Sequence, residues 1–461
     1  MKKLFSMLLV CVLVATMLSG VTVFAEALPV TVDSVDGSWA NATWDAATSI
    51  LTNVDGGYAF KATISSGKAT LSAASATLIT AASVTVPTSF TVGETTYPVV
   101  AVNGYLLTGG LTPAVTTTDV KTVVLPEGLT TINANAFRSL TGLSTINLPS
   151  TLTSIGGYAF AGAGLTSVTI PGTVTTFGTY VFSGCASLLE ITFEEGIATI
   201  PDRTCNSCSA LTTVNIPSTV TTIKAYSFYN CKFIESFGAE ISEDVWDLSH
   251  VTSMGQEAIY VNNTGWTGEL ILGISSITKQ MIRGTGLDKI TFVNPVTSIN
   301  ADNVFYTMAN LRTLVFEQGP APTAIKSTWS AKLTPALTII YPDDQMDSFK
   351  AANFGTTKIA AVMSFGGYIG SVVAGAEGGY DVTYAVANYK AKNVDKAIIA
   401  LFNGDDMVGA KVVDATVGTT LTTVNVPVTG TVTSAKIFLL DGFGNLKPAY
   451  VNDTYTVADI G

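Results

Sequence analysis

The chain has 461 residues, of which 47% are hydrophobic and 12% charged, and its formal net charge is −11. High hydrophobicity with few charges excludes a disordered polar chain. Nucleic acid is excluded as a partner, because phosphate contacts need clustered Lys and Arg and here an acidic balance is dispersed along the chain. The length predicts two or three domains.

Residues 1–25 have the pattern of a signal peptide. Lys2 and Lys3 precede an apolar run from Leu4 to Leu18, and Val23 and Ala25 place small residues before a cleavage point. We therefore expect an exported protein that is secreted, extracellular or loosely associated with the cell surface. No later apolar run is long enough to cross a bilayer, so we expect no membrane span after signal removal.

Residues 26–83 are rich in Ala, Ser and Thr and contain Trp39, Trp44, Tyr58 and Phe60. We interpret them as a β-rich N-terminal lead-in made of short strands.

The next part of the chain repeats itself. Five consecutive units follow one another in steps of 23, 22, 23 and 23 residues. They start at Val120, Leu143, Leu165, Leu188 and Leu211. A period in this range, led by Leu, predicts a solenoid of stacked coils.

One unit shows why the units must stack. In "LSTINLP", which begins at Leu143, the apolar residues alternate with Thr145 and Asn147, as a strand with one buried face requires. Pro149 cannot donate to a ladder and closes the strand, and Phe160 returns to the interior after a turn at Gly156-Gly157. Ordering such a unit costs roughly 1–2 kcal/mol per residue, which its few apolar groups cannot offset without neighbours.

The repeat therefore predicts two sets of residues. The predicted core comprises Leu143, Ile146, Leu148, Ile155, Phe160, Phe182, Cys185, Cys208, Phe228 and Cys231. The predicted solvent face comprises Thr145, Asn147, Ser167, Thr169, Glu190, Thr192, Thr213 and Asn215. Two interpretations of this face stay open: Thr suits any half-exposed strand, or a polar face of low charge binds an extended protein or glycan partner.

The pattern L-x-x-[IV]-x-[IL]-P-x-x-[LV]-x-x-I-x-x-x-x-F-x-x-C-x-x-L resembles the BspA-type leucine-rich repeats of bacterial surface and secreted proteins. The resemblance extends over a solenoid at 84–355, with an opening hairpin at Val84–Val102 and a closing strand, Pro and short helix at Ala336–Phe354. It departs from the pattern at 245–283, where we expect irregular stacking and where "VWDLSHVTSM" is similar to a D-x-S-x-V-T-x-M repeat of related proteins. The resemblance implies surface-associated interaction or adhesion without catalysis.

Residues 356–461 have a different sequence pattern. Segments with the alternation expected of β-strands are separated by turn signals such as Asn403-Gly404. Short strands at regular spacing predict a β-sandwich. The stretch "SAKIFLLDGFGNLKPAY" at 434–450 resembles the last strands of a fibronectin-III-like module. The expected fold class is therefore mainly β, a solenoid of repeats of about 22–24 residues followed by a fibronectin-III or Ig-like sandwich.

Few residues suggest chemistry. Cys205-x-x-Cys208 superficially fits a metal or redox pair, but Cys205 occupies the Phe position of its unit and no second such motif exists. His250 is the only histidine, and no activated nucleophile flanks it. We expect no catalytic residue, no metal and no cofactor.

These observations predict a non-catalytic binding or adhesion protein whose partner is an extracellular protein or a cell-wall or host glycan. Two alternatives stay open. One is a structural spacer of the cell envelope. The other is a glycan-active enzyme with an unrecognised carboxylate pair, which needs no histidine, within 26–83 or 245–283.

Overall fold

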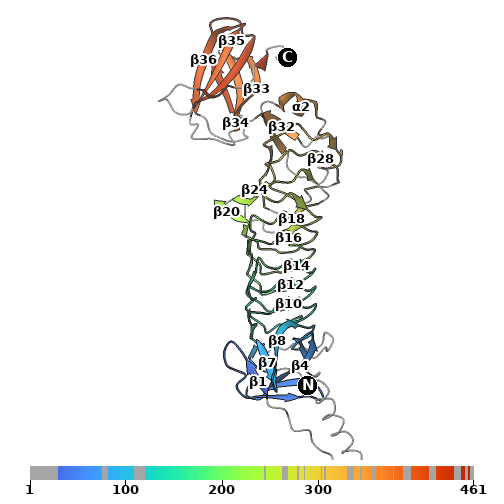
Figure 1. Ribbon diagram of the computed structural model, residues 1–461. Helices are drawn as coiled ribbons and strands as arrows, with labels where there is room; N and C mark the ends of the chain where they lie inside the picture. Colours follow the sequence, from blue (N-terminus) through green and yellow to red (C-terminus); the bar gives the residue numbers. More distant parts are fainter. Residues whose placement is uncertain are drawn as a thin grey trace, which may run out of the picture.

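The protein is described by a computed structural model in which the coils stack into one elongated solenoid, with the C-terminal sheets beyond its far end (Figure 1). The described residues are 30–74, 81–107, 120–242, 245–261, 268–277, 280–284, 286–302, 304–305, 308–329, 337–342, 345–352, 354, 359–364, 366–376, 378–387, 396–414, 422–440, 448–451 and 455–456. The expected signal peptide, at 1–25, lies outside them. No helix among the described residues is long and apolar enough to cross a membrane.

The N-terminal strands cover the first coil. They are β1 (Val30–Asp33), β2 (Ala42–Asp45), β3 (Ile50–Asn53), β4 (Tyr58–Ser65) and β5 (Lys68–Ala73). Strands β2 to β5 form an antiparallel meander, whose last strand pairs in parallel with β8 (Thr95–Val102) of the solenoid. Trp39, Trp44, Tyr58 and Phe60 are buried and belong to the same apolar cluster as the coils. The expected lead-in therefore closes the end of the solenoid core.

The expected opening hairpin is present. Strand β7 (Ser89–Val92) pairs antiparallel with β8, and Val92 lies opposite Thr95. Strand β6 (Ser83–Thr85) begins the first ladder of coils by pairing with β9 (Thr122–Val124).

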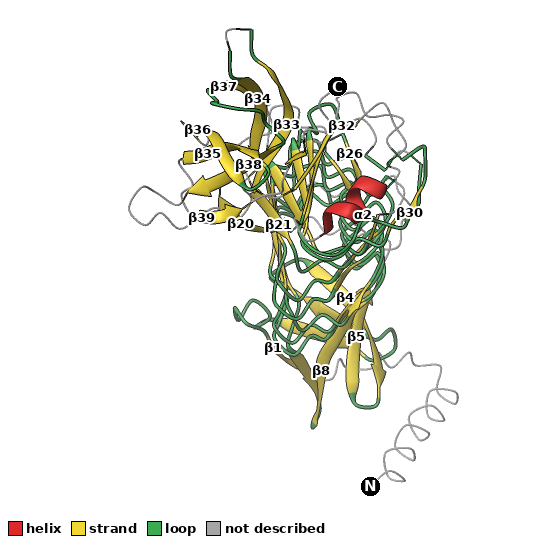
Figure 2. Ribbon diagram, turned by 90° about the horizontal axis from the view of Figure 1, so that it is seen from above, coloured by secondary structure: helices red, strands yellow, loops and turns green. Residues whose placement is uncertain are grey.

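Each coil of the repeat contributes two short strands, so the stack carries two columns of parallel strands. The first strand column contains β9, β11 (Thr145–Ile146), β13 (Ser167–Ile170), β15 (Glu190–Phe193), β17 (Thr213–Asn215) and β19 (Ser236–Phe237). The second strand column contains β10 (Thr131–Ile132), β12 (Ser154–Ile155), β14 (Thr176–Phe177), β16 (Thr199–Ile200), β18 (Thr222–Ile223) and β22 (Ser253–Met254). Figure 2 shows the coils superimposed when the stack is seen from above.

The recurrent apolar residues fill the inside of these coils. Phe137, Phe160, Phe182 and Phe228 are fully buried, and the first three are stacked on one another. One cluster runs from Trp39 to Phe354 without interruption. Since each unit alone buries too little, this continuous core is what stabilises the stack.

The coils approach closely at the predicted glycine turn. A Cβ on Gly156 would lie 2.3 Å from the backbone nitrogen of Ala134 in the preceding coil. The sequence interpretation of Gly156-Gly157 as a turn is therefore incomplete, because at Gly156 the requirement is space for the neighbouring backbone.

The first strand column is paired in two sections. Strands β6, β9 and β11 form one ladder, and β13, β15, β17 and β19 form another. The break coincides with the one unit that is 22 residues long, from Leu143 to Leu165. On the other side of β11, its pairing with β9 ends at Ile146, and there the side chain of Asn147 bonds to the backbone of Leu125: its Nδ2 donates to the Leu125 carbonyl at 2.7 Å, and its Oδ1 accepts from the Leu125 N–H at 2.8 Å.

Stacking continues through 245–283, where the sequence pattern departs from the repeat. Strand β21 (Val245–Leu248) pairs in register with β24 (Glu269–Leu272), and β23 (Ile259–Tyr260) pairs with β26 (Ile282–Arg283). The irregularity is the antiparallel pair of β20 (Ala239–Ser242) with β21, which projects from the side of the solenoid in Figure 1. Beside this pair, the parallel pairing of β21 with β24 and of β23 with β26 is kept.

The C-terminal half of the solenoid is built on a second long sheet. After β20, β21 and β24, its strands are β27 (Lys289–Phe292), β29 (Thr313–Phe316), β31 (Leu337–Tyr341) and β32 (Ile359–Ser364). The other strand column continues in β25 (Ser276–Ile277), β28 (Ser298–Ile299) and β30 (Ala324–Ile325). The expected closing segment is found as β31, Pro342 and the helix α2 (Met346–Ala351).

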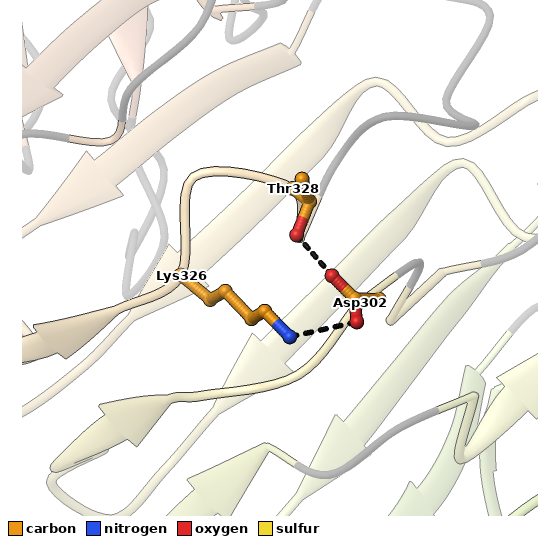
Figure 3. A network of polar contacts seen from close by, with 3 residues as sticks. All are labelled: Asp302, Lys326 and Thr328. Carbon is orange, nitrogen blue, oxygen red and sulfur yellow. Dashed lines mark hydrogen bonds and ion pairs between the residues drawn. The ribbon is translucent and has the colours of Figure 1, made fainter.

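Polar contacts also join neighbouring coils. Lys326 Nζ lies 2.7 Å from Asp302 Oδ2, while Thr328 donates to the other carboxylate oxygen of Asp302 (Figure 3). Similar contacts recur earlier, where Ser150 donates its backbone N–H and its hydroxyl to Glu127, and Ser218 donates both groups to Glu195. In each case, the carboxylate of one coil accepts hydrogen bonds from the next coil and so holds the two coils in register.

Beyond the solenoid lie two antiparallel sheets. One contains β33 (Gly366–Ala374), β34 (Tyr380–Ala387) and β37 (Thr422–Val426). The other contains β35 (Lys396–Asn403), β36 (Asp406–Asp414), β38 (Ser434–Leu440), β39 (Pro448–Val451) and β40 (Tyr455–Thr456). Residues from both sheets form one apolar cluster, which is separate from that of the solenoid.

Candidate functional site

The predicted solvent face forms rows of polar side chains along the first strand column. In the second section of that column, Ser167, Glu190, Thr213 and Ser236 are direct partners across the strands, and so are Thr169, Thr192 and Asn215. Thr145, Asn147, Ser167, Thr169 and Glu190 are exposed, whereas Thr192, Thr213 and Asn215 are half-buried. Parallel strands lie about 4.8 Å apart, so the rows repeat at that spacing.

Side chains of these rows also bond to one another. Asn215 Nδ2 donates to Glu190 Oε1 at 3.0 Å and to Thr192 Oγ1 at 2.9 Å. Asn147, in the corresponding row, bonds instead to the backbone of the preceding coil, as described above. The amide of Asn147 is therefore committed to the fold, while the network at Asn215 lies on the surface.

The rows end in an open pocket of about 550 Å³. Its lining residues are Glu190, Phe193, Thr213, Asn215, Ile216, Pro217, Ser236 and Gly238. Three of them, Glu190, Thr213 and Asn215, belong to the predicted face. The pocket joins this polar network to the apolar side of Ile216 and Phe193.

The pocket forms where the first strand column changes course. Gly238 has a φ of +86°, and a Cβ there would lie 2.7 Å from the carbonyl oxygen of Asp247. This glycine lets β20 turn back beside β21, so the ladder ends at β19, with no further strand paired to it in the described part of the chain. Sequence reasoning missed Ser236 and Gly238, since the required partner, Asp247, belongs to the irregular stretch.

The predicted core residues lie mainly where the repeat places them. Leu143, Ile155, Phe160, Phe182 and Phe228 are fully buried, and Ile146 is buried. Leu148 is the exception: it is only half-buried and packs against the cluster from its edge, because β11 already ends at Ile146. The assignment of Leu148 to the interior is corrected accordingly.

The four described cysteines are buried and free. Cys185 donates its thiol to the carbonyl of Phe160, and Cys208 donates to that of Phe182, each at 3.1 Å. Cys231 does the same to Cys205, also at 3.1 Å. Desolvation by burial raises the pKa of Cys205, and it raises the pKa of Cys231 to about 12. These thiols therefore satisfy the carbonyls of the preceding coil and are poor nucleophiles.

His250 is half-buried in the turn after β21. Burial lowers the pKa of its imidazole, while the negative charges of Asp247 and Glu195 act in the opposite direction. Its Nε2 atom is buried and has no hydrogen-bond partner among the described residues.

The carboxylates in the two segments considered for an enzymatic site make structural contacts. Asp36 accepts a hydrogen bond from the Thr85 hydroxyl at 2.6 Å, and Glu257 lies 3.0 Å from Arg283. Glu269 lies 2.9 Å from Lys289. Within the described ranges, no group of three or more His, Cys, Asp or Glu residues is placed to hold a metal ion.

Sequence reasoning missed a second feature, a line of Tyr and Arg side chains along the turns that follow the second strand column. We call it the tyrosine–arginine band. It comprises Arg138, Tyr158, Tyr180, Arg203, Tyr226, Tyr229, Tyr260 and Arg283, all half-buried. Its signal was present in the repeat, because Tyr158, Tyr180, Arg203 and Tyr226 each stand two residues before the Phe position of their unit.

Ring and guanidinium contacts connect the band from coil to coil. The rings of Tyr158 and Tyr180 are stacked with centroids 4.6 Å apart, and Arg138 lies 5.0 Å from the Tyr158 centroid. Arg203 lies between two rings, 5.2 Å from the Tyr180 centroid and 4.5 Å from the Tyr226 centroid. Further along, the rings of Tyr229 and Tyr260 are 5.1 Å apart, and Arg283 lies 4.7 Å from the latter.

The backbone of this band is in an unfavourable conformation. Tyr158, Tyr180, Arg203 and Tyr226 have φ values between 56° and 59°. The left-handed region costs a residue with a side chain roughly 1–2 kcal/mol, and Asn135, at the same position of the first unit, has a φ of 61°, so this conformation belongs to the turn of the repeat. Cation–π and ring contacts of about 0.5–1 kcal/mol each offset part of this cost.

Comparisons with known proteins agree with the repeat geometry. Residues 114–235 match, in six copies, the family described as BspA type leucine rich repeat region. A search of curated proteins finds no match.

Several solved structures are similar over most of their length. A leucine-rich repeat protein from Bacteroides ovatus is 16% identical, with 66% of this chain and 89% of that chain covered and a TM-score of 0.39. A leucine rich cell surface protein from Faecalibacterium prausnitzii is 17% identical, with 70% and 95% covered and a TM-score of 0.36. The pneumococcal vaccine antigen PcpA is 14% identical, with 70% and 98% covered and a TM-score of 0.33. The family match at residues 114–235 falls within the part of the chain whose spacing resembles BspA-type leucine-rich repeats.

Proposed function

We propose that the protein is an exported, non-catalytic bacterial binding or adhesion protein that presents the first strand column to an extracellular protein or glycan. The observation that carries this proposal is the pocket at the end of the polar rows, because it combines the end of a strand ladder with the side-chain network of Glu190, Thr192 and Asn215. The match to BspA-type repeats supports it.

The chemistry of the face suits hydrogen bonding to a neutral or weakly charged partner. Hydroxyl and amide groups repeat from coil to coil at about 4.8 Å, and Glu190 is the one carboxylate of the pocket lining. The apolar residues Phe193 and Ile216, which are themselves buried, complete the lining beside these groups. A ligand site typically combines such apolar lining with a few placed polar groups.

The two ends of the chain also have roles in this proposal. Residues 1–25 serve as a signal peptide, which makes the mature protein secreted or surface-associated. The two C-terminal antiparallel sheets with their shared core support a fibronectin-III or Ig-like sandwich over 356–461. In this arrangement, the solenoid is the binding part and the sandwich a separate module.

The test is a glycan and host-protein array probed with the mature protein and two variants. Asn215→Ala removes both hydrogen bonds of the pocket network and is expected to weaken binding of any partner found by about tenfold, which corresponds to the loss of roughly 1.5 kcal/mol. Thr222→Ala lies on the second strand column of the same coil and serves as the matched control. Equal binding by both variants would refute the assignment of the partner to this face.

The array also separates the alternatives. A structural spacer of the cell envelope predicts no partner on the array for the solenoid face. A glycan-active enzyme predicts that a bound glycan is shortened with time, which reducing-end analysis of the recovered glycan detects.

A further inference from the structure

We propose that the tyrosine–arginine band is a second binding site, separate from the first strand column, and that it takes an acidic polysaccharide, a linear glycan that bears carboxylate or sulfate groups. The proposal concerns a different edge of the solenoid from the polar rows and does not depend on their function. Its central residue is Arg203.

Arg203 has hydrogen-bonding capacity that the fold does not use. The rings of Tyr180 and Tyr226 lie against its guanidinium group, yet among the described residues its side chain makes no hydrogen bond or ion pair. Asp202 precedes it in the chain, but no ion pair between the two is found in that described part. Because N–H bonds lie in the guanidinium plane, a group held between rings keeps its donors at the rim, where a planar anionic group binds in a bidentate manner.

The arginines of the band recur with a regular interval. Arg138 lies in the coil of β10, Arg203 in that of β16 and Arg283 in that of β26, so each is three coils from the next. At about 4.8 Å per coil, neighbouring guanidinium groups are roughly 14 Å apart along the stack. Cations spread along the stack at this interval fit an extended linear chain with spaced charges better than a compact ligand.

The tyrosines indicate which kind of polysaccharide the band binds. The two faces of the Tyr158 ring are covered by Arg138 and Tyr180, so stacking of a neutral sugar on that ring is blocked. What remains accessible on such half-buried rings is the edge with its hydroxyl group. Phenol hydroxyls beside guanidinium groups recognise hydroxyl and carboxylate or sulfate groups together, as an acidic polysaccharide presents them.

Local charge is consistent with this ligand. The chain as a whole is acidic, whereas the band contains three arginines, of which Arg283 forms an ion pair with Glu257. An anionic chain is thus attracted to this edge of an otherwise repellent surface, and the attraction weakens as salt rises.

The experiment measures binding of the mature protein to three immobilised polysaccharides, which are dextran sulfate, polygalacturonate and neutral dextran, and to immobilised poly-glutamate. Biolayer interferometry at low and at physiological salt gives the affinities. We expect binding to the two acidic chains, no binding to dextran, and weaker binding at higher salt. Arg203→Gln is expected to reduce affinity for the acidic chains about tenfold or more, because it removes a charge-assisted contact.

Two further variants make the result specific. Lys68→Gln removes the same charge from the exposed hairpin between β4 and β5 and is expected to bind like the wild type. Arg203→Lys keeps the charge but loses the planar fork, so an intermediate affinity is expected. If Arg203→Gln lowers the thermal unfolding midpoint, Arg203→Lys becomes the deciding variant, and wild-type affinity in it would overturn the proposal.

Other results would also overturn it. Equal losses of affinity for the acidic chains in Arg203→Gln and Lys68→Gln would show that binding depends on the net charge of the protein alone. Equal binding of neutral dextran would remove the role of the anion, and binding of poly-glutamate without either acidic polysaccharide would assign the band to an acidic polypeptide instead. Loss of acidic-chain binding in Asn215→Ala, with none in Arg203→Gln, would place these ligands on the polar rows and likewise overturn the proposal.

Discussion

The stacked phenylalanines provide the most direct test of the solenoid core. Phe160 is fully buried, and its ring lies parallel to those of Phe137 and Phe182 at centroid distances of 5.3 and 5.2 Å. Phe160→Ala therefore removes one large side chain and two ring contacts at once. Truncation of a buried Phe costs about 3–5 kcal/mol, and we expect a value in the upper part of that range because each lost aromatic pair adds about 0.5–1.5 kcal/mol.

Phe233 offers a matched control for this substitution. It lies in the same repeat region, but 56% of its surface is exposed, so Phe233→Ala is expected to change stability by less than about 0.5 kcal/mol. Urea denaturation followed by far-UV circular dichroism gives the comparison. Since repeat stacks can unfold in sections, hydrogen exchange of peptides over 143–182 should show faster exchange in Phe160→Ala and unchanged exchange in Phe233→Ala. Similar unfolding midpoints for the two variants would refute the interior position of this ring.

Three further predictions concern titratable groups. Hydrogen bonds from the Ser218 hydroxyl and backbone N–H lower the pKa of Glu195, so this contact adds stability above pH 4.5 that is lost as the pH falls through the folded value, and Glu195→Gln should flatten the acid side of a stability profile. Burial lowers the pKa of His250, so the unfolded chain binds the proton more readily and stability falls as the pH drops below 6.5; NMR titration of this single histidine should give a pKa under 6.5, and a higher value would contradict its burial. Native protein should resist thiol labelling at Cys231 until it unfolds, because burial raises the pKa of its thiol to about 12; rapid labelling of folded protein by Ellman's reagent would contradict the buried position.

The sequence predicted the features that depend on contacts repeated in every unit. The spacing of Leu, Ile and Phe identified the strands and the buried ring stack, because each coil meets the same environment as its neighbours. It could not place Leu148, whose burial depends on how far β11 continues. The sequence also could not show why position 156 requires glycine. The missing Cβ leaves room for the backbone nitrogen of Ala134, which belongs to another coil.

The features that sequence reasoning missed depend on particular partners. The tyrosine–arginine band occupies a recurrent position, but its meaning comes from which side chain lies in the next coil, as Arg203 does between Tyr180 and Tyr226. The pocket depends on Gly238 and Asp247, which meet only because β20 turns back on β21. Such pairs are not encoded by the period, so a repeat pattern predicts the scaffold more completely than the sites on it.

Asn147 and Asn215 show why the sites vary on a uniform scaffold. They occupy the same position of the repeat. Asn147 lies in the coil directly before the break between β11 and β13, and Asn215 lies in the coil before β19, where the ladder ends. Asn147 lies where the backbone ladder stops, and its amide forms the two hydrogen bonds with Leu125 that backbone groups would otherwise make. At Asn215 the backbone ladder is complete, with Thr192 as its partner, so the amide bonds to side chains and faces the pocket. The amide at this position of the repeat therefore bonds to other side chains only where the backbone is already paired, and it is the local pairing, more than the residue type, that leaves the amide of Asn215 beside the pocket.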